Sequence, residues 1–294
     1  MSAGKFIESL IRGKICKCFL LFCLPCLVWA QDPLSRWEIG VTAGGMNYIG
    51  DLNKQSVLGK VNLAFGIVGR YNISDRWSVA VTGSYGHLQG GEPDVIALRN
   101  LSFRSYLWEG AARVEFNFVP FGTSGIHFRT TPFLFCGLGF FSFNPTAQYA
   151  DPVTGEQLWT DLQPLHTEGQ SLEQFPDRKP YSLAQIAFPF GFGFKIAFSK
   201  SITMTMEYGF RKTWTDYIDD VSTTYVGEQA LGVGSLSALL ADRSGEVEPG
   251  YVNAAGIQRG DDSLDDWYAY FNLSLVFNMQ TLFGWMRSKK CDIK

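Results

Sequence analysis

A strict alternation of side-chain character between residues 182 and 198 constrains this chain more than any other feature of its sequence. Apolar residues occupy every second position from 184 to 198, and the positions between them hold small or polar residues with a single charge, Lys195. Because successive side chains of a β-strand point to opposite faces, the segment is predicted to be a strand with one apolar face that meets lipid. A soluble sandwich could bury that face, but its opposite face would usually carry more charge. The apolar face consists of Ala184, Ile186, Phe188, Phe190, Phe192, Phe194, Ile196 and Phe198.

The same two-residue period recurs in seven other segments of the chain. They are residues 37–43, 62–71, 77–85, 106–118, 131–143, 202–211 and 267–278. Residues 131–143 are nearly all apolar, so which of their side chains face inward stays open. Single-chain bacterial barrels have an even number of strands, each with a lipid face and a lumen face. The sequence therefore predicts an all-β fold: an eight-stranded antiparallel transmembrane β-barrel of the outer membrane, with long external loops and short periplasmic turns.

The composition argues against several other classes of protein. Charged residues make up 18% of the chain, below the roughly 25% of an average soluble protein, and aromatic residues make up 15%. Disorder requires low hydrophobicity and high net charge, and a helical membrane protein requires runs of about 20 apolar residues. The formal net charge of −3 gives no indication of a nucleic-acid-binding face.

Charged side chains of the predicted strands fall on the face opposite the apolar one. An eight-stranded barrel is just wide enough for its interior to be filled by side chains. We therefore expect these charges to pair across a packed polar interior rather than to line a conducting pore or an active site. They are Glu38, Arg70, Glu109, Arg113, Glu115, Lys195, Glu207 and Arg211.

The connections between the predicted strands alternate in length, which predicts an orientation. Outer-membrane barrels have short periplasmic turns and long external loops, so both termini are expected in the periplasm. The short connections are residues 72–76, 119–129 and 199–201, and the long ones are 44–60, 87–102, 144–181 and 213–265.

The two ends of the chain differ from the barrel. Residues 1–30 combine basic residues with a short apolar run and end in Ala30, which is typical of a cleaved secretory signal peptide. A retained anchor, or a lipoprotein signal at Cys23 or Cys26, is the alternative. The barrel is predicted over residues 31–278. Residues 279–294 form a basic periplasmic tail that is either solvated or in contact with an acidic partner or the inner leaflet.

The sequence carries no pattern that indicates catalysis. No G-x-S-x-G occurs, and the three histidines fall in predicted connections, so no enzyme activity, cofactor or metal site is predicted. Acidic runs at 216–220 and 261–266 lack EF-hand spacing; solvated loop acids are the ordinary interpretation and calcium binding the alternative. The glycines at 44–45, 50 and 90–91 are interpreted as turn residues.

Three segments carry short motifs in a fixed order along the chain. One segment follows the first predicted strand, and the other two lie in the third and fourth long connections. The motif residues are Asn47, Tyr48, Gly50, Asp51, Leu52, Thr167, Glu168, Gly169, Gln170, Asp216, Tyr217, Asp219 and Asp220. Taken in order, these motifs resemble the PorG-like outer-membrane β-barrels of the Bacteroidota type IX secretion system, and smaller pieces extend the resemblance over most of residues 36–278.

The resemblance implies a non-enzymatic role in protein secretion. A PorG-like barrel associates with the periplasmic ring proteins of the type IX secretion system and helps to hold that ring at the outer membrane. The implied partners are those ring proteins and outer-membrane lipid, with no nucleic acid. The alternative is a general surface barrel that acts as an adhesin or binding module through its external loops. The turn residues expected to contact the ring are Asn72, Ser74, Asp75, Arg76, Gly122, Thr123, Ser124, Ser199 and Lys200.

Overall fold

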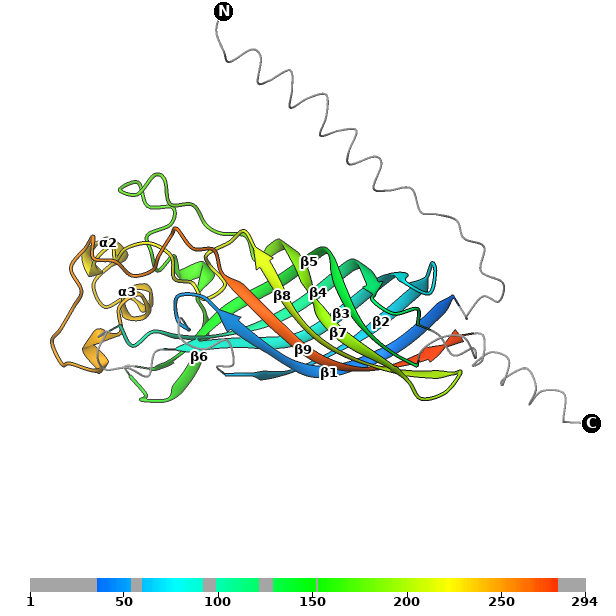
Figure 1. The fold of residues 1–294 in the computed structure, drawn as a ribbon. Helices are drawn as coiled ribbons and strands as arrows, with labels where there is room; N and C mark the ends of the chain where they lie inside the picture. The colour runs from blue at the N-terminus through cyan, green and yellow to red at the C-terminus, as the bar shows by residue number, and fades with distance from the viewer. Residues whose placement is uncertain (1–35, 54–59, 92–98, 122–128, 152, 280–294) are drawn as a thin grey trace, which may run out of the picture. The chain divides into compact units, whose positions relative to one another are not determined.

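Eight antiparallel strands close into a barrel in the computed structural model, which describes residues 36–53, 60–91, 99–121, 129–151 and 153–279 (Figure 1). Each strand pairs with the next around the ring, and pairing of β1 with β9 and of β4 with β5 completes it. The predicted eight-stranded fold is therefore confirmed. The barrel strands are β1 (Trp37–Ile49), β2 (Asn62–Asn72), β3 (Trp77–Gly91), β4 (Ser102–Asn117), β5 (Thr130–Ala150), β7 (Ala184–Ala197), β8 (Ile202–Thr213) and β9 (Trp267–Asn278).

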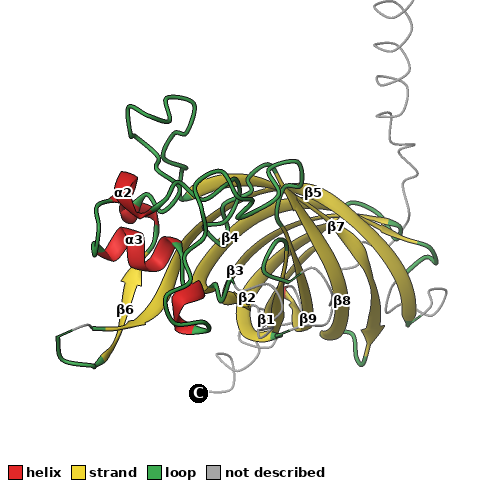
Figure 2. Cartoon of the chain, turned by 90° about the vertical axis from the view of Figure 1, so that its left-hand side faces the viewer, coloured by secondary structure: helices red, strands yellow, loops and turns green. Residues whose placement is uncertain are grey.

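The long and short connections lie at opposite ends of the barrel. We call these the long-loop end, with connections 50–61, 92–101, 151–183 and 214–266, and the short-turn end, with connections 73–76, 118–129 and 198–201. Figure 2 views the barrel from the long-loop end, where the loops gather beside its mouth. The proposed signal peptide (1–30) and basic tail (279–294, except its first residue) lie outside the described residues.

Several short elements within the long connections were not predicted. β5 continues to residue 150, beyond the barrel wall, and forms a hairpin there with β6 (Gln157–Asp161). The connection that follows β6 holds η1 (Gln163–Leu165), and the β8–β9 connection holds α2 (Glu228–Leu231), α3 (Leu236–Ala241) and η2 (Ser244–Glu246). Among the described residues, no helix has the length and apolar character needed to cross a membrane.

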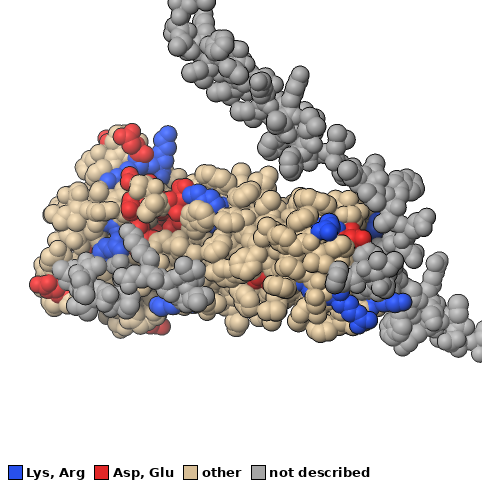
Figure 3. Space-filling view, viewed as in Figure 1, with Lys and Arg blue, Asp and Glu red and all other residues tan. Residues whose placement is uncertain are grey.

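The outward face of the barrel is apolar along the strands. Leu63, for example, exposes 71% of its surface, whereas its chain neighbours Asn62 and Ala64 point inward and are buried. Figure 3 shows this face as a largely uncharged band, with charged side chains gathered toward the two ends of the strands. Such an outer surface is the one that a lipid bilayer accommodates. Further exposed members include Ile39, Phe65, Ile67, Val81, Trp108, Leu138, Phe140, Ile186, Phe192 and Phe194.

The facing of β5, which the sequence left open, is now defined. Phenylalanines at alternate positions point into the barrel: Phe133, Phe135, Phe141 and Phe143 are each at most 5% exposed. Leucines and Phe140 at the intervening positions point outward. Room for the inward rings comes from glycines on the neighbouring strands, since a Cβ added at residue 193 would lie 2.6 Å from the Phe133 ring.

The interior of the barrel is filled by ion pairs and rings. All of the charges predicted to face inward do so, and Glu115, which is fully buried, illustrates their pairing. Its carboxylate lies 2.8 Å from Arg70 Nε, 2.7 Å from Lys195 Nζ and 3.0 Å from Arg113 Nη2. A cavity beside Tyr270 measures about 10 Å³, room for about one water. The prediction of a packed polar interior is confirmed, and the other pairs are Arg113–Glu207, Arg211–Glu109 and Arg70–Glu38.

Candidate functional site

Three long connections meet in one buried group of polar side chains at the long-loop end. We call it the carboxylate cluster, and define it as Tyr48, Asp51, Thr167, Glu168, Tyr181, Asp216, Asp219, Asp220, Arg259 and Asp266. Each member is at most 9% exposed. The motif segments that carry the family resemblance therefore converge in space, although they lie far apart in the sequence. The expectation that the acids of the β8–β9 connection are solvated is wrong for Asp216, Asp219, Asp220 and Asp266.

Tyr48 lies at the centre of the carboxylate cluster, near the end of β1. Its hydroxyl is 2.6 Å from Asp219 Oδ2 and 2.6 Å from Asp266 Oδ1. A phenol can donate only one hydrogen, so a second short contact requires a proton on one of the two carboxyls. The geometry therefore indicates that at least one of the carboxyl groups of Asp219 and Asp266 is protonated.

Gly50 leaves the space that this arrangement needs. A Cβ at residue 50 would lie 2.0 Å from Asp266 Oδ1 and 2.1 Å from the Tyr48 hydroxyl. Gly50 does not have a positive φ, and neither do the glycines at 44–45 and 90–91. The interpretation of these glycines as turn residues is therefore wrong for 44–45 and 90–91, which lie inside β1 and β3, and at residue 50 the requirement is close packing.

Glu168 holds the start of the β8–β9 connection in place. Its carboxylate accepts hydrogen bonds from the backbone N–H of Ser222 (2.9 Å) and of Thr223 (3.0 Å), and from the Thr223 hydroxyl (2.7 Å). Arg259 Nη1 donates to the same carboxylate at 2.9 Å. Arg259 also donates to the carbonyl oxygens of Asp220 and Ala241, so a single guanidinium joins four segments of the long-loop end.

Asp220 and the tyrosines beside it complete the carboxylate cluster. Thr167 Oγ1 donates to Asp220 Oδ2 (2.5 Å), and the Tyr181 hydroxyl donates to Asp220 Oδ1 (2.7 Å). The Tyr181 ring stacks on Tyr217 with centroids 4.7 Å apart. Tyr181 is 8% exposed, which places it inside the cluster.

The other motif residues lie beside the cluster, where the Tyr217 hydroxyl donates to Glu168 Oε2 at 3.4 Å. Asn47 is buried, and Leu52 packs into the hydrophobic core that fills the barrel below the loops. Gly169 has φ +74°, a conformation that favours glycine, and Gln170 accepts a hydrogen bond from the backbone N–H of Glu168.

Carboxyl groups outnumber basic groups in the carboxylate cluster by six to one. Burial raises the pKa of Asp216 to about 8 and that of Asp219 to about 7, and nearby carboxylates add to both effects. Burial also raises the pKa of Asp220, to about 6, although Arg259 opposes the change. Among the described residues, no three His, Cys, Asp or Glu side chains are arranged to hold a metal ion.

The β8–β9 connection should lose stability as the pH rises. The folded pKa values of Asp216, Asp219 and Asp220 lie above the ordinary 3.8, so the folded connection binds protons more tightly than the unfolded chain. Their stabilising contribution is fully present below about pH 4, and each contribution declines as the pH rises from about 4 to that group's folded pKa of about 6, 7 or 8. Hydrogen exchange of residues 214–266, corrected for intrinsic rates, should show falling protection between about pH 5 and pH 8. Asp216→Asn should flatten the upper part of this profile, and protection independent of pH would contradict the expectation.

The short turns predicted to contact a partner lie together at the other end of the barrel. Ser74 Oγ accepts hydrogen bonds from the N–H groups of Arg76 and Trp77, which closes the β2–β3 turn. Arg76 Nη1 donates to the Phe118 carbonyl (2.6 Å), and the Asp75 carbonyl accepts from the Asn117 amide (3.1 Å). The β2–β3 turn is therefore joined to the start of the β4–β5 connection, and the two form one surface.

The other predicted turn residues add to this end of the barrel or are not described. Asn72, at the end of β2, accepts a hydrogen bond from the Ser78 hydroxyl through its side-chain carbonyl. Ser199 Oγ accepts from the N–H of Ser201 and of Ile202, and Lys200 is exposed between them. Gly122, Thr123 and Ser124 lie outside the described residues.

A closed barrel with an apolar outer wall and a filled interior defines the class of outer-membrane-type β-barrels. Within that class, the chain belongs to the family described as Domain of unknown function (DUF6089), whose model matches residues 16–239. No curated protein matches the chain.

Solved structures of other small barrels are similar to this chain at low sequence identity. Neisserial surface protein A is 9% identical, with a TM-score of 0.40 over 84% of this chain and 99% of that one. Ail, the attachment invasion locus protein of Yersinia pestis, in complex with sucrose octasulfate, is 10% identical, with a TM-score of 0.37 over 82% and 98%. OprG from Pseudomonas aeruginosa is 11% identical, with a TM-score of 0.40 over 82% and 95%.

Proposed function

We propose that this protein is a non-enzymatic outer-membrane component of the type IX protein secretion system, where it anchors the periplasmic ring complex. The observation that carries the anchoring role is the filled interior. Among the described residues, four cations and four carboxylates pair inside the barrel, and the cavity beside Tyr270 has room for about one water, which supports a barrel that passes no solute. A barrel of this kind acts through its ends. The ordered series of motifs that resemble PorG-like barrels supports the place in the secretion system.

The proposed orientation has the short-turn end and both termini in the periplasm. The rule that periplasmic turns are short and external loops long supports it. In this orientation the surface made by the β2–β3 turn and residues 118–121 faces the periplasm, together with the exposed Lys200. Arg76 is also exposed there, so this end offers positive charge to a partner.

Lys200→Glu should weaken co-purification of the ring proteins several-fold, because it reverses an exposed charge on the proposed contact surface without breaking a described hydrogen bond. The measurement is the yield of ring proteins recovered with an affinity-tagged barrel from solubilised outer membranes. Lys179→Glu is the matched control, because it makes the same exchange at an exposed position at the long-loop end.

Two results would separate the secretion role from the orientation. If deletion of the gene leaves ring assembly and secretion of cargo with C-terminal signals intact, the secretion role is wrong. If Lys179→Glu weakens co-purification while Lys200→Glu does not, the barrel has the opposite orientation, and the contact surface is at the long-loop end.

A surface-binding role through the external loops is the second candidate function. The ordered β8–β9 connection favours it, because a connection of this length that is tied down by buried hydrogen bonds can hold a binding site in a fixed shape. A ligand screen on whole cells that carry loop deletions would test this role separately from secretion.

A further inference from the structure

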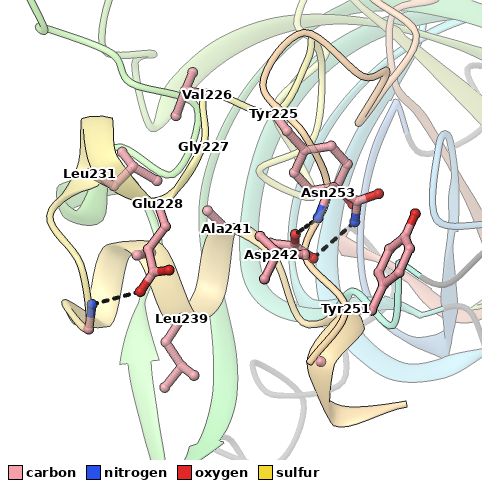
Figure 4. A pocket seen from close by; sticks show the side chains of 14 residues that line it. Tyr225, Val226, Gly227, Glu228, Leu231, Leu239, Ala241, Asp242, Tyr251 and Asn253 are labelled. Carbon is pink, nitrogen blue, oxygen red and sulfur yellow. Dashed lines mark hydrogen bonds between the residues drawn. The ribbon is translucent and has the colours of Figure 1, made fainter. Parts of the chain in front are cut away.

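The β8–β9 connection encloses a pocket of about 350 Å³ (Figure 4). This volume is at the lower end of the range for small-molecule sites, about 300–1,000 Å³. The walls come from α2, α3 and the extended segments on either side of them. Apolar side chains form most of the surface: Val226, Leu231, Ala238, Leu239, Ala241 and Val252. We call this space the connection pocket.

Two carboxylates and two tyrosines are the distinctive lining groups of the connection pocket. Figure 4 shows Tyr225 and Tyr251 on one side of it with Asn253 between them, and Glu228 on the opposite side. Asp242 lies between the two sides. The lining residues include no lysine, arginine or histidine.

The charges of both carboxylates lack a basic partner in the described structure. Asp242 accepts hydrogen bonds from the N–H and side-chain amide of Asn253 (2.6 and 3.0 Å) and from Ser244, and all of these donors are neutral. Glu228 Oε1 accepts from the N–H of Gly234 at 2.9 Å. The nearby Arg243 pairs with Glu246 instead. The connection pocket therefore combines apolar walls with two negative charges that no described cation balances.

This combination matches one class of ligand. Carboxylates without a basic partner in a partly dry site, and the faces of tyrosine rings, make the binding free energy of a positively charged group more favourable. An apolar body gains from burial against aliphatic walls. We propose that the connection pocket binds an organic ammonium ion with an apolar body, with the ammonium between Glu228 and Asp242. The ammonium belongs either to a free amine or to a lysine side chain of a peptide.

The proposal goes beyond the anchoring role. The pocket lies in the connection between β8 and β9 at the long-loop end, whereas the surface proposed for the ring is at the short-turn end. Either proposal can therefore fail without affecting the other.

The test uses three probes of similar shape on the full-length barrel in detergent. Phenethylammonium, 2-phenylethanol and phenylacetate differ in charge, and isothermal titration or ligand-observed NMR measures their binding. The ammonium should bind most tightly and phenylacetate least, and added salt should weaken only the ammonium. Equal affinity for all three probes, or no binding by any of them, would overturn the proposal.

Variants then locate the site. Glu228→Gln should lower the affinity for phenethylammonium about tenfold and leave 2-phenylethanol unchanged, because it removes one charge-assisted contact. Val252→Trp fills the pocket from a position that is already 58% exposed and should abolish binding of both probes without unfolding the connection. Glu248→Gln, an exposed acid of the same connection outside the pocket, is the matched control. Unchanged ammonium affinity in both Glu228→Gln and Val252→Trp would overturn the proposal.

A competition experiment distinguishes the two sources of the ammonium. Acetyl-Gly-Lys-Gly-amide carries the same charge on a peptide side chain. Displacement of phenethylammonium by this peptide identifies a lysine side chain as the occupant, and failure to displace it identifies a free amine.

Discussion

Glu115→Ala should destabilise the barrel more than any other single change inside it. Glu115 is fully buried and contacts Arg70, Lys195 and Arg113, so the change leaves three cations without their shared carboxylate. Breaking a buried ion pair by removing one partner costs about 3–5 kcal/mol. In urea titrations of the detergent-folded protein, followed by tryptophan fluorescence, the midpoint should fall accordingly. The heat-modified band on gels should appear at a lower temperature.

Glu156→Ala is the control for this experiment. Glu156 is exposed in the turn between β5 and β6, and its removal should change the free energy of unfolding by less than about 0.5 kcal/mol. Glu115→Gln, which keeps the volume and one acceptor oxygen, should give an intermediate result. A Glu115→Ala barrel that unfolds at the wild-type urea concentration would contradict the view that Glu115 organises the interior.

Arg259→Ala should release the β8–β9 connection while the barrel stays closed. Arg259 is 2% exposed, and its loss leaves the buried Glu168 without a cationic partner. It also removes the donors to the carbonyl oxygens of Asp220 and Ala241. We expect the local free energy of opening to fall by about 3–5 kcal/mol, which hydrogen exchange of residues 214–266 would measure.

Arg243→Ala provides a matched comparison within the same connection. Arg243 pairs with the partly exposed Glu246 three residues along the chain, a kind of contact worth less than about 1 kcal/mol. Its removal should leave exchange nearly unchanged. If Arg259→Ala and Arg243→Ala have equal effects, the carboxylate cluster does not hold the connection in place.

The barrel itself could be predicted from the sequence because lipid imposes a simple rule on it. Outward side chains at alternate positions must be apolar, and this rule predicted the eight strand segments and the inward direction of the charged side chains between them. The rule fails for β5, where both faces carry large apolar residues. The inward rings of Phe133 and Phe135 fit only because β7 and β8 provide glycines opposite them, at residues 191, 193 and 209. Each of these glycines lies on a different strand from the ring that it accommodates, so the sequence of β5 alone does not show which of its faces points inward.

The carboxylate cluster could be predicted only in part. The motif series contained Tyr48, Glu168 and Asp219, but no local pattern indicated that these residues meet. Arg259 and Tyr181 were not recognised as members, since a lone arginine or tyrosine in a long connection has no distinguishing spacing. The acids were expected in water because acidic loop residues usually are solvated. Here tyrosine and threonine hydroxyls and backbone N–H groups from distant segments replace that water.

The contact between Tyr48 and Asp266 lies at the seam where the first and last strands of the ring meet. Tyr48 precedes the last residue of β1, and Asp266 immediately precedes β9, in the register that pairs Ile49 with Trp267. A shift of one residue along this seam would turn every inward side chain of β9 toward lipid, and it would also move Asp266 away from the Tyr48 hydroxyl. Formation of the carboxylate cluster therefore depends on the correct register between β1 and β9. A barrel closed in a register shifted by one residue could not form the cluster, so the cluster favours the correct closure.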